Sequence, residues 1–326
     1  MVAYVEAVAG FVLLLIGGEF LVRGAVALAR GLGLSPLFVG LTVVAFGTSA
    51  PELVVSLFAA LEGKPGIAVG NVVGSNIANI MLILGTAALV YPIACRGRAL
   101  FRNSMVMLGA TAMFVLIAHA GTLTRLHGVL MLVALVLYLV YSYRTDRQDQ
   151  EAAGEIVREV AELEGTGDAG WRVAAKLLGG VVGVAVGSEF LVDGGSAIAR
   201  DLGVSEAVIG LTMIAVGTSL PELATGIIAA CHKHSDLALG NVVGSNIFNI
   251  LSVMGLVVLV TPVDVPAKII AADLWVMLGV SVAFVALAFA LGHVGRWLGL
   301  FLLFGYALYA AVQFGGMDAL ALIGVR

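Results

Sequence analysis

The sequence is poor in charged residues and in the residues that bind soft metals. Only 12% of its 326 residues are Asp, Glu, Lys or Arg, whereas a soluble protein carries about 25%. Its 17 Lys and Arg residues are scattered and form no basic stripe, which argues against a nucleic-acid partner. Cys95 and Cys231 are isolated and lack metal-ligand spacing, so we interpret both as small apolar residues.

Hydrophobic residues fill most of the chain instead. They make up 61% of it and give a mean hydropathy of +1.09. Apolar runs of about 20 residues, long enough to cross a ~30 Å hydrocarbon core as helices, recur along the chain. We predict ten spans, at residues 3–24, 36–60, 67–92, 100–119, 125–143, 172–194, 206–230, 237–261, 269–291 and 297–314. The expected fold is an all-α polytopic membrane protein, because lipid offers no partner for unpaired backbone groups.

One long polar segment lies between the fifth and sixth spans. Residues 144–170 contain eight acidic and three basic residues. We interpret this segment as a solvated linker between two halves rather than as a regulatory element. The predicted domains are a first five-helix repeat at residues 1–143, the linker at 144–170, and a second repeat at 171–326.

The two halves are related by duplication. Residues 17–80 align with residues 187–250 without a gap, and 35 of the 64 positions are identical. Because five spans is an odd number, the second repeat is predicted to be inverted in the membrane relative to the first. Lys and Arg number twelve on one side and five on the other, which predicts a cytoplasmic linker and both termini outside.

The first repeated motif places costly polar residues inside an apolar span. It reads Gly47-Thr48-Ser49-Ala50-Pro51-Glu52-Leu53 and recurs as Gly217-Thr218-Ser219-Leu220-Pro221-Glu222-Leu223. Pro51 lacks an N–H and crowds the carbonyl of Gly47, so we expect the helix to kink or break near residues 47–49. Such a break survives in a membrane only where it is buried in protein or lines a polar cavity.

The second motif follows in the next span and adds neutral oxygens. Residues 70–80 read Gly-Asn-Val-Val-Gly-Ser-Asn-Ile-Ala-Asn-Ile, and residues 240–250 repeat them with one change. Ser75 and Asn79 are four residues apart and share a helix face, as do Ser245 and Asn249. The broken helices are therefore predicted to be the second, third, seventh and eighth, with their polar residues converging near the midplane.

Hard cations suit this predicted cluster. Calcium takes six to eight oxygen ligands from carboxylates, carbonyls and amides, and two glutamates would neutralise one Ca²⁺. Sodium is served by the same neutral oxygens. The absence of His and Cys from the motifs disfavours zinc.

Simpler interpretations apply to the other polar residues in the spans. A single Gly-x-x-x-Gly, such as Gly70 to Gly74, is more typical of helix packing than of function. Glu19 and Glu189 lie toward the ends of their spans, so we interpret them as interfacial anchors. Asp273 has no assigned function.

Together, the two doubled motifs resemble the alpha-repeats of the cation/calcium antiporter superfamily, and most closely its prokaryotic sodium/calcium exchangers. The resemblance covers all ten spans and implies an antiporter that works by alternating access. In the central site it implies that Glu52 and Glu222 are shared by Ca²⁺ and Na⁺, and that Thr48 and Thr218 offer backbone carbonyls to Ca²⁺. It further implies flanking sodium sites formed by Ala45, Ser49, Ser75, Ala215, Ser219 and Ser245.

One position departs from that family's pattern. Similar archaeal exchangers carry Asn in the first repeat and Asp in the second where this chain has Asn79 and Asn249, so two central carboxylates remain rather than three. The transported counter-ion and the stoichiometry therefore stay open, with Ca²⁺/H⁺ or K⁺-dependent exchange as alternatives.

The remaining expectations follow from this assignment. A hydrolase with Ser49 or Ser219 as nucleophile is the alternative from another class, but only the loop residues His232 and His234 could supply a base. We therefore expect no enzymatic activity and no cofactor beyond the transported ions. The expected location is a prokaryotic inner membrane, with lipid as the surroundings and no obligate protein partner.

Overall fold

The computed structural model describes residues 2–161, 170–202 and 217–315, and these are mostly helical. The elements of the first half are α1 (Val2–Leu32), α2 (Pro36–Val39), η1 (Gly40–Val44), α3 (Ala45–Thr48), α4 (Ala50–Leu61), α5 (Pro65–Ala78), η2 (Asn79–Ile83), α6 (Leu84–Val90), β1 (Ile93–Ala94), α7 (Arg98–Ala118), β2 (Thr122–Leu123) and α8 (Arg125–Ala161). Those of the second are α9 (Gly170–Asp201), α11 (Leu220–Cys231), α12 (Ser235–Phe248), η3 (Asn249–Met254), α13 (Gly255–Val260), β3 (Val263–Asp264), η4 (Ile269–Asp273), α14 (Leu274–Leu291), β4 (His293–Val294) and α15 (Arg296–Gly315).

Most of these helices have the length and composition of membrane spans. Eight described helices are long and apolar enough to cross a membrane, and a bent pair, residues 36–48 with 50–61, makes up to nine. The predicted span at 206–230 falls partly outside the described residues, and α11 is the part that the structure describes. The chain is therefore an integral membrane protein, as predicted.

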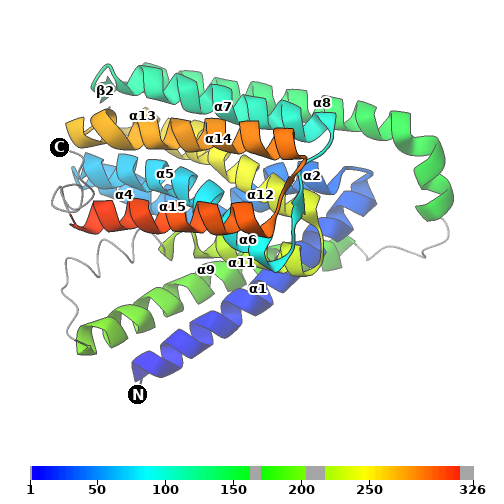
Figure 1. Ribbon diagram of the computed structural model, residues 1–326, viewed down its shortest axis with the longest axis horizontal. Coiled ribbons are helices and arrows are strands. Elements are labelled where there is room, and N and C mark those ends of the chain that lie inside the picture. Colours follow the sequence, from blue (N-terminus) through cyan, green and yellow to red (C-terminus); the bar gives the residue numbers. More distant parts are fainter. Residues whose placement is uncertain (1, 162–169, 203–216, 316–326) are drawn as a thin grey trace.

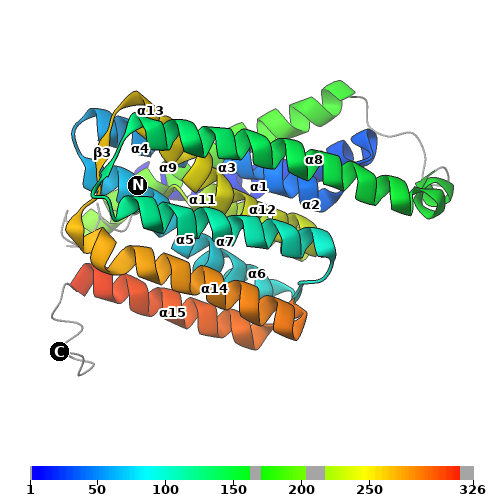
Figure 2. The same ribbon diagram turned by 90° about the horizontal axis from the view of Figure 1, so that it is seen from above.

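The core is formed by two central spans, α5 with η2 and α6, and α12 with η3 and α13. In the span made of α12, η3 and α13, 89% of the apolar stretch is buried inside the protein, and in the span made of α5, η2 and α6 the share is 72%. In α15 it is 11%. Figure 2 shows α5, α6 and α12 between α8 and α15. The most buried spans are the ones that carry the second repeated motif, so its polar side chains lie inside protein rather than in lipid.

Helices α1 and α9 form a long pair on one side of the molecule (Figure 1). They run side by side with glycines where their backbones meet. A Cβ atom at Gly17 would lie 2.6 Å from the Val184 nitrogen, and one at Gly187 would lie 2.7 Å from the Leu14 nitrogen. Close approach of this kind is what small residues permit between membrane helices.

The polar segment after the fifth span is partly helical. Helix α8 continues to Ala161 and extends past the rest of the bundle (Figure 1), so the helix does not end at 143, where the sequence placed the end of the first domain. Its extension is tied to the bundle by Asp146, which is buried and accepts hydrogen bonds from the hydroxyl and the backbone N–H of Ser35. Ser35 in turn caps α2, because its hydroxyl accepts a bond from the Phe38 N–H at 3.0 Å.

The two cysteines differ in exposure. Cys95 is buried in the connection between α6 and α7, and burial raises the pKa of its thiol to about 11, as suits a small apolar residue. Cys231 is exposed at the end of α11. Burial supports the interpretation of Cys95 as a small apolar residue, and for Cys231 that interpretation stays a prediction.

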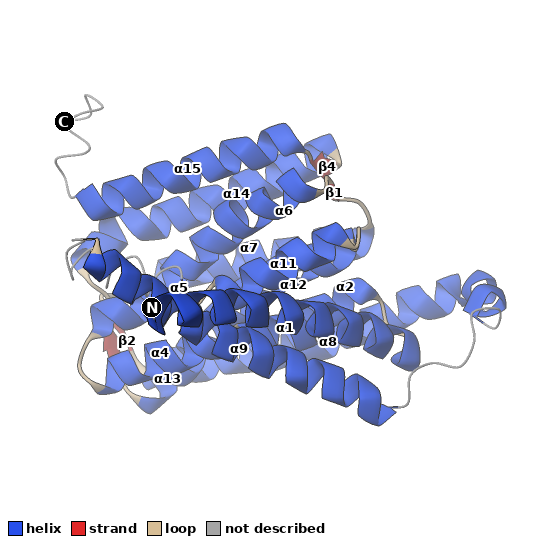
Figure 3. Cartoon of the chain, turned by 90° about the horizontal axis from the view of Figure 1, so that it is seen from below, coloured by secondary structure: helices blue, strands red, loops and turns tan. Residues whose placement is uncertain are grey.

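Two short ribbons join the halves at opposite ends of the helices (Figure 3). β1 pairs with β4, with Ile93 opposite Val294, and β2 pairs with β3, with Leu123 opposite Val263. Positions 93 and 263 are 170 residues apart, the same offset as the sequence duplication. Each ribbon thus joins one strand from each half.

Candidate ion-binding site

The first repeated motif lies at a bend. The helix axis turns by 43° between residues 36–48 and 50–61, and Ser49, with φ −83° and ψ 7°, is the residue between them. Pro51 follows in the first turn of α4, where its missing N–H costs no helical bond. The predicted kink is therefore present, at the carboxyl end of the predicted interval.

The second copy of this motif has the same local form. Ser219 has φ −89° and ψ 2°, and Pro221 and Glu222 fall in the first turn of α11. Glu52 has the corresponding place in α4. The start of a helix favours a negative charge, because its first N–H groups have no partner within the helix. This placement offsets part of the cost of a buried carboxylate.

The carbonyls of Gly47 and Gly217, to which the two prolines cannot donate, differ in their surroundings. Proline cannot donate to the residue four positions earlier, which is Gly47 in one copy and Gly217 in the other. The Gly217 carbonyl accepts a bond at 2.5 Å from the hydroxyl of Ser188 on α9. The first half has Gly18 at the position equivalent to Ser188. The Gly217 carbonyl therefore has a partner within the protein.

Side chains from the two halves meet at the carboxylates. Glu52 is 1% exposed and Glu222 is fully buried. Ser49 donates to Glu222 Oε1 at 3.2 Å, which joins the first motif of one half to the glutamate of the other. Ser75 donates to Glu52 Oε1 at 3.5 Å and accepts from Ser219 at 3.4 Å. The convergence predicted from the sequence is present.

Asn71 and Asn241 bridge the two halves and were not singled out from the sequence. Thr218 donates to Asn71 Oδ1 and Thr48 donates to Asn241 Oδ1, both at 3.2 Å. Each amide also donates to the carbonyl of the glutamate in its own half, Asn71 at 3.2 Å and Asn241 at 3.4 Å. Their position four residues before Ser75 and Ser245 was the available signal, because that spacing puts them on the same helix face.

Two π-helical segments begin at the other central asparagines. η2 starts at Asn79 and η3 at Asn249, and π-helical turns inside α-helices are frequent at functional sites. Asn79 donates to Asn246 Oδ1 at 3.0 Å across the two halves. Asn246 donates in turn to the sulfur of Met107 at 3.5 Å.

Several buried polar atoms have no hydrogen-bond partner among the described residues. Those at the two repeated motifs are Glu52 Oε2, Glu222 Oε2, Ser245 Oγ, Asn76 Oδ1, Asn79 Oδ1 and both amide atoms of Asn249. Buried polar atoms without partners are uncommon and call for an explanation. Two carboxylate oxygens with neutral oxygens around them match what hard cations prefer. No group of three or more His, Cys, Asp or Glu side chains suited to a metal occurs in the described part of the chain.

Three other residues named from the sequence are Ala45, Ala215 and Asp273. Ala45 is buried, and its Cβ would lie 2.8 Å from a Cβ built at Gly244, so this glycine serves helix packing. Ala215 lies outside the described residues. Asp273 is buried and accepts bonds from Tyr309, at 3.3 Å, and from Gln313.

Glu19 is not part of the buried cluster. Its carboxylate is bonded to Arg23 at 2.5 Å and to His232 at 2.8 Å, and its side chain is 30% exposed. Glu189 is also exposed. Both positions are consistent with interfacial residues.

Buried carboxylates among neutral oxygens inside apolar helices define a class, the membrane proteins that handle cations or protons. The family model described as "Sodium/calcium exchanger protein" matches residues 2–144 and again residues 173–315. The chain belongs to this sodium/calcium exchanger family, which is a family of transporters and not of enzymes.

Individual relatives are similar to this protein over nearly the whole chain. The "Putative antiporter CaxA" of Alkalimonas amylolytica is 38% identical over 91% of this chain and 92% of its own length. The "Sodium/calcium exchanger MaX1" of Methanosarcina acetivorans is 31% identical over 94% of this chain and 96% of its own. A structure of the sodium-calcium exchanger NCX_Mj soaked with zero Na⁺ and Ca²⁺ superposes with a TM-score of 0.81 at 31% identity, covering 96% of this chain and 98% of that one.

Proposed function

We propose that this protein exchanges Ca²⁺ for Na⁺ across the membrane by alternating access, as a ten-helix exchanger built from two inverted five-helix repeats. The observation that carries the proposal is the pair of buried glutamates, Glu52 and Glu222, each with an oxygen that has no partner among the described residues. A buried carboxylate in a membrane span costs at least a few kcal/mol and commonly marks an ion path. The names of the relatives point to the same class of reaction.

The inverted arrangement is supported by the two ribbons. β1 with β4 and β2 with β3 are related by the offset of the duplication and lie at opposite ends of the helices. A repeat that had kept its orientation would bring both ribbons to one end. The odd number of predicted spans per half leads to the same topology.

Each part of the site has a proposed role. Glu52 and Glu222 bind both ions and supply the negative charge that attracts them. Thr48 and Thr218 offer backbone carbonyls to Ca²⁺, and their hydroxyls are held by Asn241 and Asn71. The flanking sodium sites are assigned to Ala45, Ser49, Ser75, Ala215, Ser219 and Ser245. Asn79 and Asn249 complete the polar lining without adding charge.

The balance of charge gives the exchange its dependence on voltage. Three Na⁺ against one Ca²⁺ would move one net charge per cycle, worth ~2.3 kcal/mol per 100 mV. We place residues 144–170 in the cytoplasm and both termini outside, because the Lys and Arg residues are twelve on that side and five on the other.

Transport into liposomes tests the proposal. Calcium uptake by the purified protein is measured with an outward gradient of Na⁺, of H⁺ or of K⁺ in turn, with the other ions equal on both sides. We expect uptake to follow the Na⁺ gradient and to respond to an imposed membrane potential. Uptake that persists without a Na⁺ gradient and follows H⁺ would contradict Na⁺ coupling, and a requirement for K⁺ together with Na⁺ would indicate K⁺-dependent exchange.

A further inference from the structure

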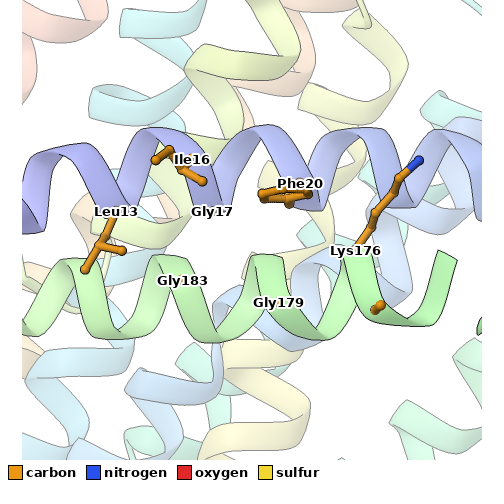
Figure 4. Close-up of a pocket in the computed structure, with 8 residues that line it drawn as sticks. Leu13, Ile16, Gly17, Phe20, Lys176, Gly179 and Gly183 are labelled. Atoms are coloured by element: carbon orange, nitrogen blue, oxygen red, sulfur yellow. The ribbon is translucent and has the colours of Figure 1, made fainter. Parts of the chain in front are cut away.

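A cavity lies between α1 and α9, away from the buried glutamates. Its volume is about 300 Å³, at the lower end of the ~300 to 1,000 Å³ range of small-molecule sites. It is lined by Leu13, Ile16, Gly17 and Phe20 of α1 and by Ala175, Lys176, Gly179 and Gly183 of α9. Figure 4 shows these residues between the two helices.

The glycines explain why the two helices leave a cavity here. Gly17 and Gly183 bring the backbones together, since a Cβ at Gly183 would lie 3.0 Å from the Gly17 Cα. One turn away, no described atom lies within 4 Å of a Cβ built at Gly179. The missing side chain at Gly179 therefore opens a groove opposite Phe20.

The wall of the groove is apolar and faces outward. Ile16 is 49% exposed and Phe20 is 46% exposed. Both lie on a helix that belongs to a membrane protein, so the medium that reaches them is the hydrocarbon of the lipid. A shape of this kind fits an acyl chain.

One end of the groove is basic. Figure 4 shows the side chain of Lys176 rising from α9 toward α1 at that end. Arg172 lies four residues earlier, on the same helix face, and its guanidinium lies 5.5 Å from the centre of the ring of Trp171, which is 70% exposed. Trp, Lys and Arg together are typical of the boundary between lipid and water, where basic residues attract anionic headgroups.

Glu19 adjoins Phe20 in sequence, and its two carboxylate oxygens are bonded to Arg23 and His232. The basic end is also the end at which Arg23 and the start of α9 are predicted to face the cytoplasm. An anionic headgroup there meets positive charge beside an apolar groove.

We propose that this groove binds one anionic phospholipid, with an acyl chain along Ile16, Phe20 and Gly179 and with the phosphate at Lys176 and Arg172. The proposal is independent of ion exchange, because none of the groove residues belongs to the buried cluster. Its occupant touches α1 and α9 together, so it is a ligand of the helix pair rather than of the core.

Native mass spectrometry of the detergent-purified protein tests the site directly. The protein is titrated with phosphatidylglycerol and, separately, with phosphatidylcholine of the same acyl chains. We expect one tightly bound phosphatidylglycerol per chain and much weaker binding of phosphatidylcholine. Lys176→Gln and Arg172→Gln should each weaken phosphatidylglycerol binding by roughly fivefold, because each removes one basic residue near the headgroup.

A substitution that fills the groove separates the acyl chain from the headgroup. Gly179→Leu should abolish the bound lipid, because its side chain enters the open space. Gly279→Leu on α14 is the matched control, since Gly279 is also exposed and has no described atom within 4 Å of a built Cβ. It should bind phosphatidylglycerol as the unmodified protein does.

Three results would overturn the proposal. They are equal affinity for the two lipids, equal loss of binding in both leucine variants, and a Gly179→Leu variant that changes the oligomeric state without changing the bound lipid. The last result would show that a second copy of the chain covers the groove. The two glutamine variants lie at the surface and keep the test valid if Gly179→Leu fails to fold.

Discussion

The two copies of the site share a frame, the hydrogen bonds of Asn71 and Asn241, but differ in the residues around it. Asn71 and Asn241 each bridge a threonine of the other half and a glutamate carbonyl of their own. Asn71 also donates to the Ser56 hydroxyl at 2.9 Å, a bond that the second copy lacks because position 226 is glycine. Duplication therefore preserved the bonds that hold the halves together and allowed the surroundings to diverge.

The difference is largest at the atoms without partners. Ser75 bonds to Glu52 and Ser219, whereas Ser245 Oγ has no partner among the described residues. Asn79 donates to Asn246, whereas both amide atoms of Asn249 are without a described partner. At these two positions Ser75 and the Asn79 amide nitrogen are bonded within the protein, whereas Ser245 Oγ and the Asn249 amide have no described partner.

The strongest test of the shared frame is removal of each carboxylate charge. Glu52→Gln and Glu222→Gln should each lower Ca²⁺ exchange by roughly 100-fold or more, since each removes one partner of the proposed buried pair of glutamate and cation, and losing one partner of a buried ion pair costs ~3 to 5 kcal/mol. Exchange is measured as Na⁺-driven ⁴⁵Ca uptake in liposomes. Glu19→Gln is the control and should keep most of the activity, and full activity in both central variants would place the ions elsewhere.

The asparagine bridges should rank next and should differ from each other. Asn71→Ala and Asn241→Ala each remove the link between a buried threonine hydroxyl and a glutamate carbonyl, and losing a partner of a buried polar group costs ~1 to 3 kcal/mol. Thr48 keeps its bond to the Ala45 carbonyl at 3.4 Å in Asn241→Ala. We expect roughly tenfold weaker apparent affinity for Ca²⁺, with the larger loss in Asn71→Ala because it also breaks the bond to Ser56. Concentration dependence of uptake separates affinity from maximal rate, and a loss confined to maximal rate would argue against a role in shaping the site.

Substitutions of the two central asparagines, Asn79 and Asn249, should affect different properties, thermal stability in one case and transport in the other. Asn79→Ala removes the donor to Asn246 Oδ1, so we expect it to lower the melting temperature by about 2 to 5 °C. Asn249→Ala removes no described hydrogen bond and should leave the melting temperature unchanged while altering the Na⁺ dependence of exchange. Thermal unfolding in detergent and uptake at varied Na⁺ measure the two effects, and equal melting shifts would remove the distinction.

The smallest expected effect concerns the carbonyl of Gly217. Ser188→Ala removes its hydroxyl donor and makes the second copy resemble the first, which has Gly18 at that place. We expect a two- to threefold change in Ca²⁺ affinity, which corresponds to the lower end of the ~0.5 to 1.5 kcal/mol of a typical hydrogen bond. Ser56→Ala removes the hydroxyl that only the first copy has at its position, beside Asn71, and serves as the comparison. A tenfold effect of Ser188→Ala alone would mean that the Gly217 carbonyl is central to the site.

Local chemistry predicted the bend at Ser49 and the convergence of the two motifs. Both follow from residues that leave few choices, a proline in a span and polar side chains that cannot face lipid. The Asn71 and Asn241 bridges were missed because their threonine partners lie in the other half, and sequence spacing reports only neighbours on the same helix. The bond from Ser188 to the Gly217 carbonyl and the bonds from Ser35 to Asp146 are tertiary contacts, which no local pattern encodes.

The ribbons have a consequence for assembly. Each of them joins a strand from one half to a strand from the other, and the asparagine bridges and the α1–α9 pair also cross between halves. The peptide connection at residues 162–169 is therefore one tie among many. Two separately translated fragments, divided within that connection, should associate in the membrane and form the exchanger. Two chains of an ancestral dimer would have associated in the same way before their genes were fused.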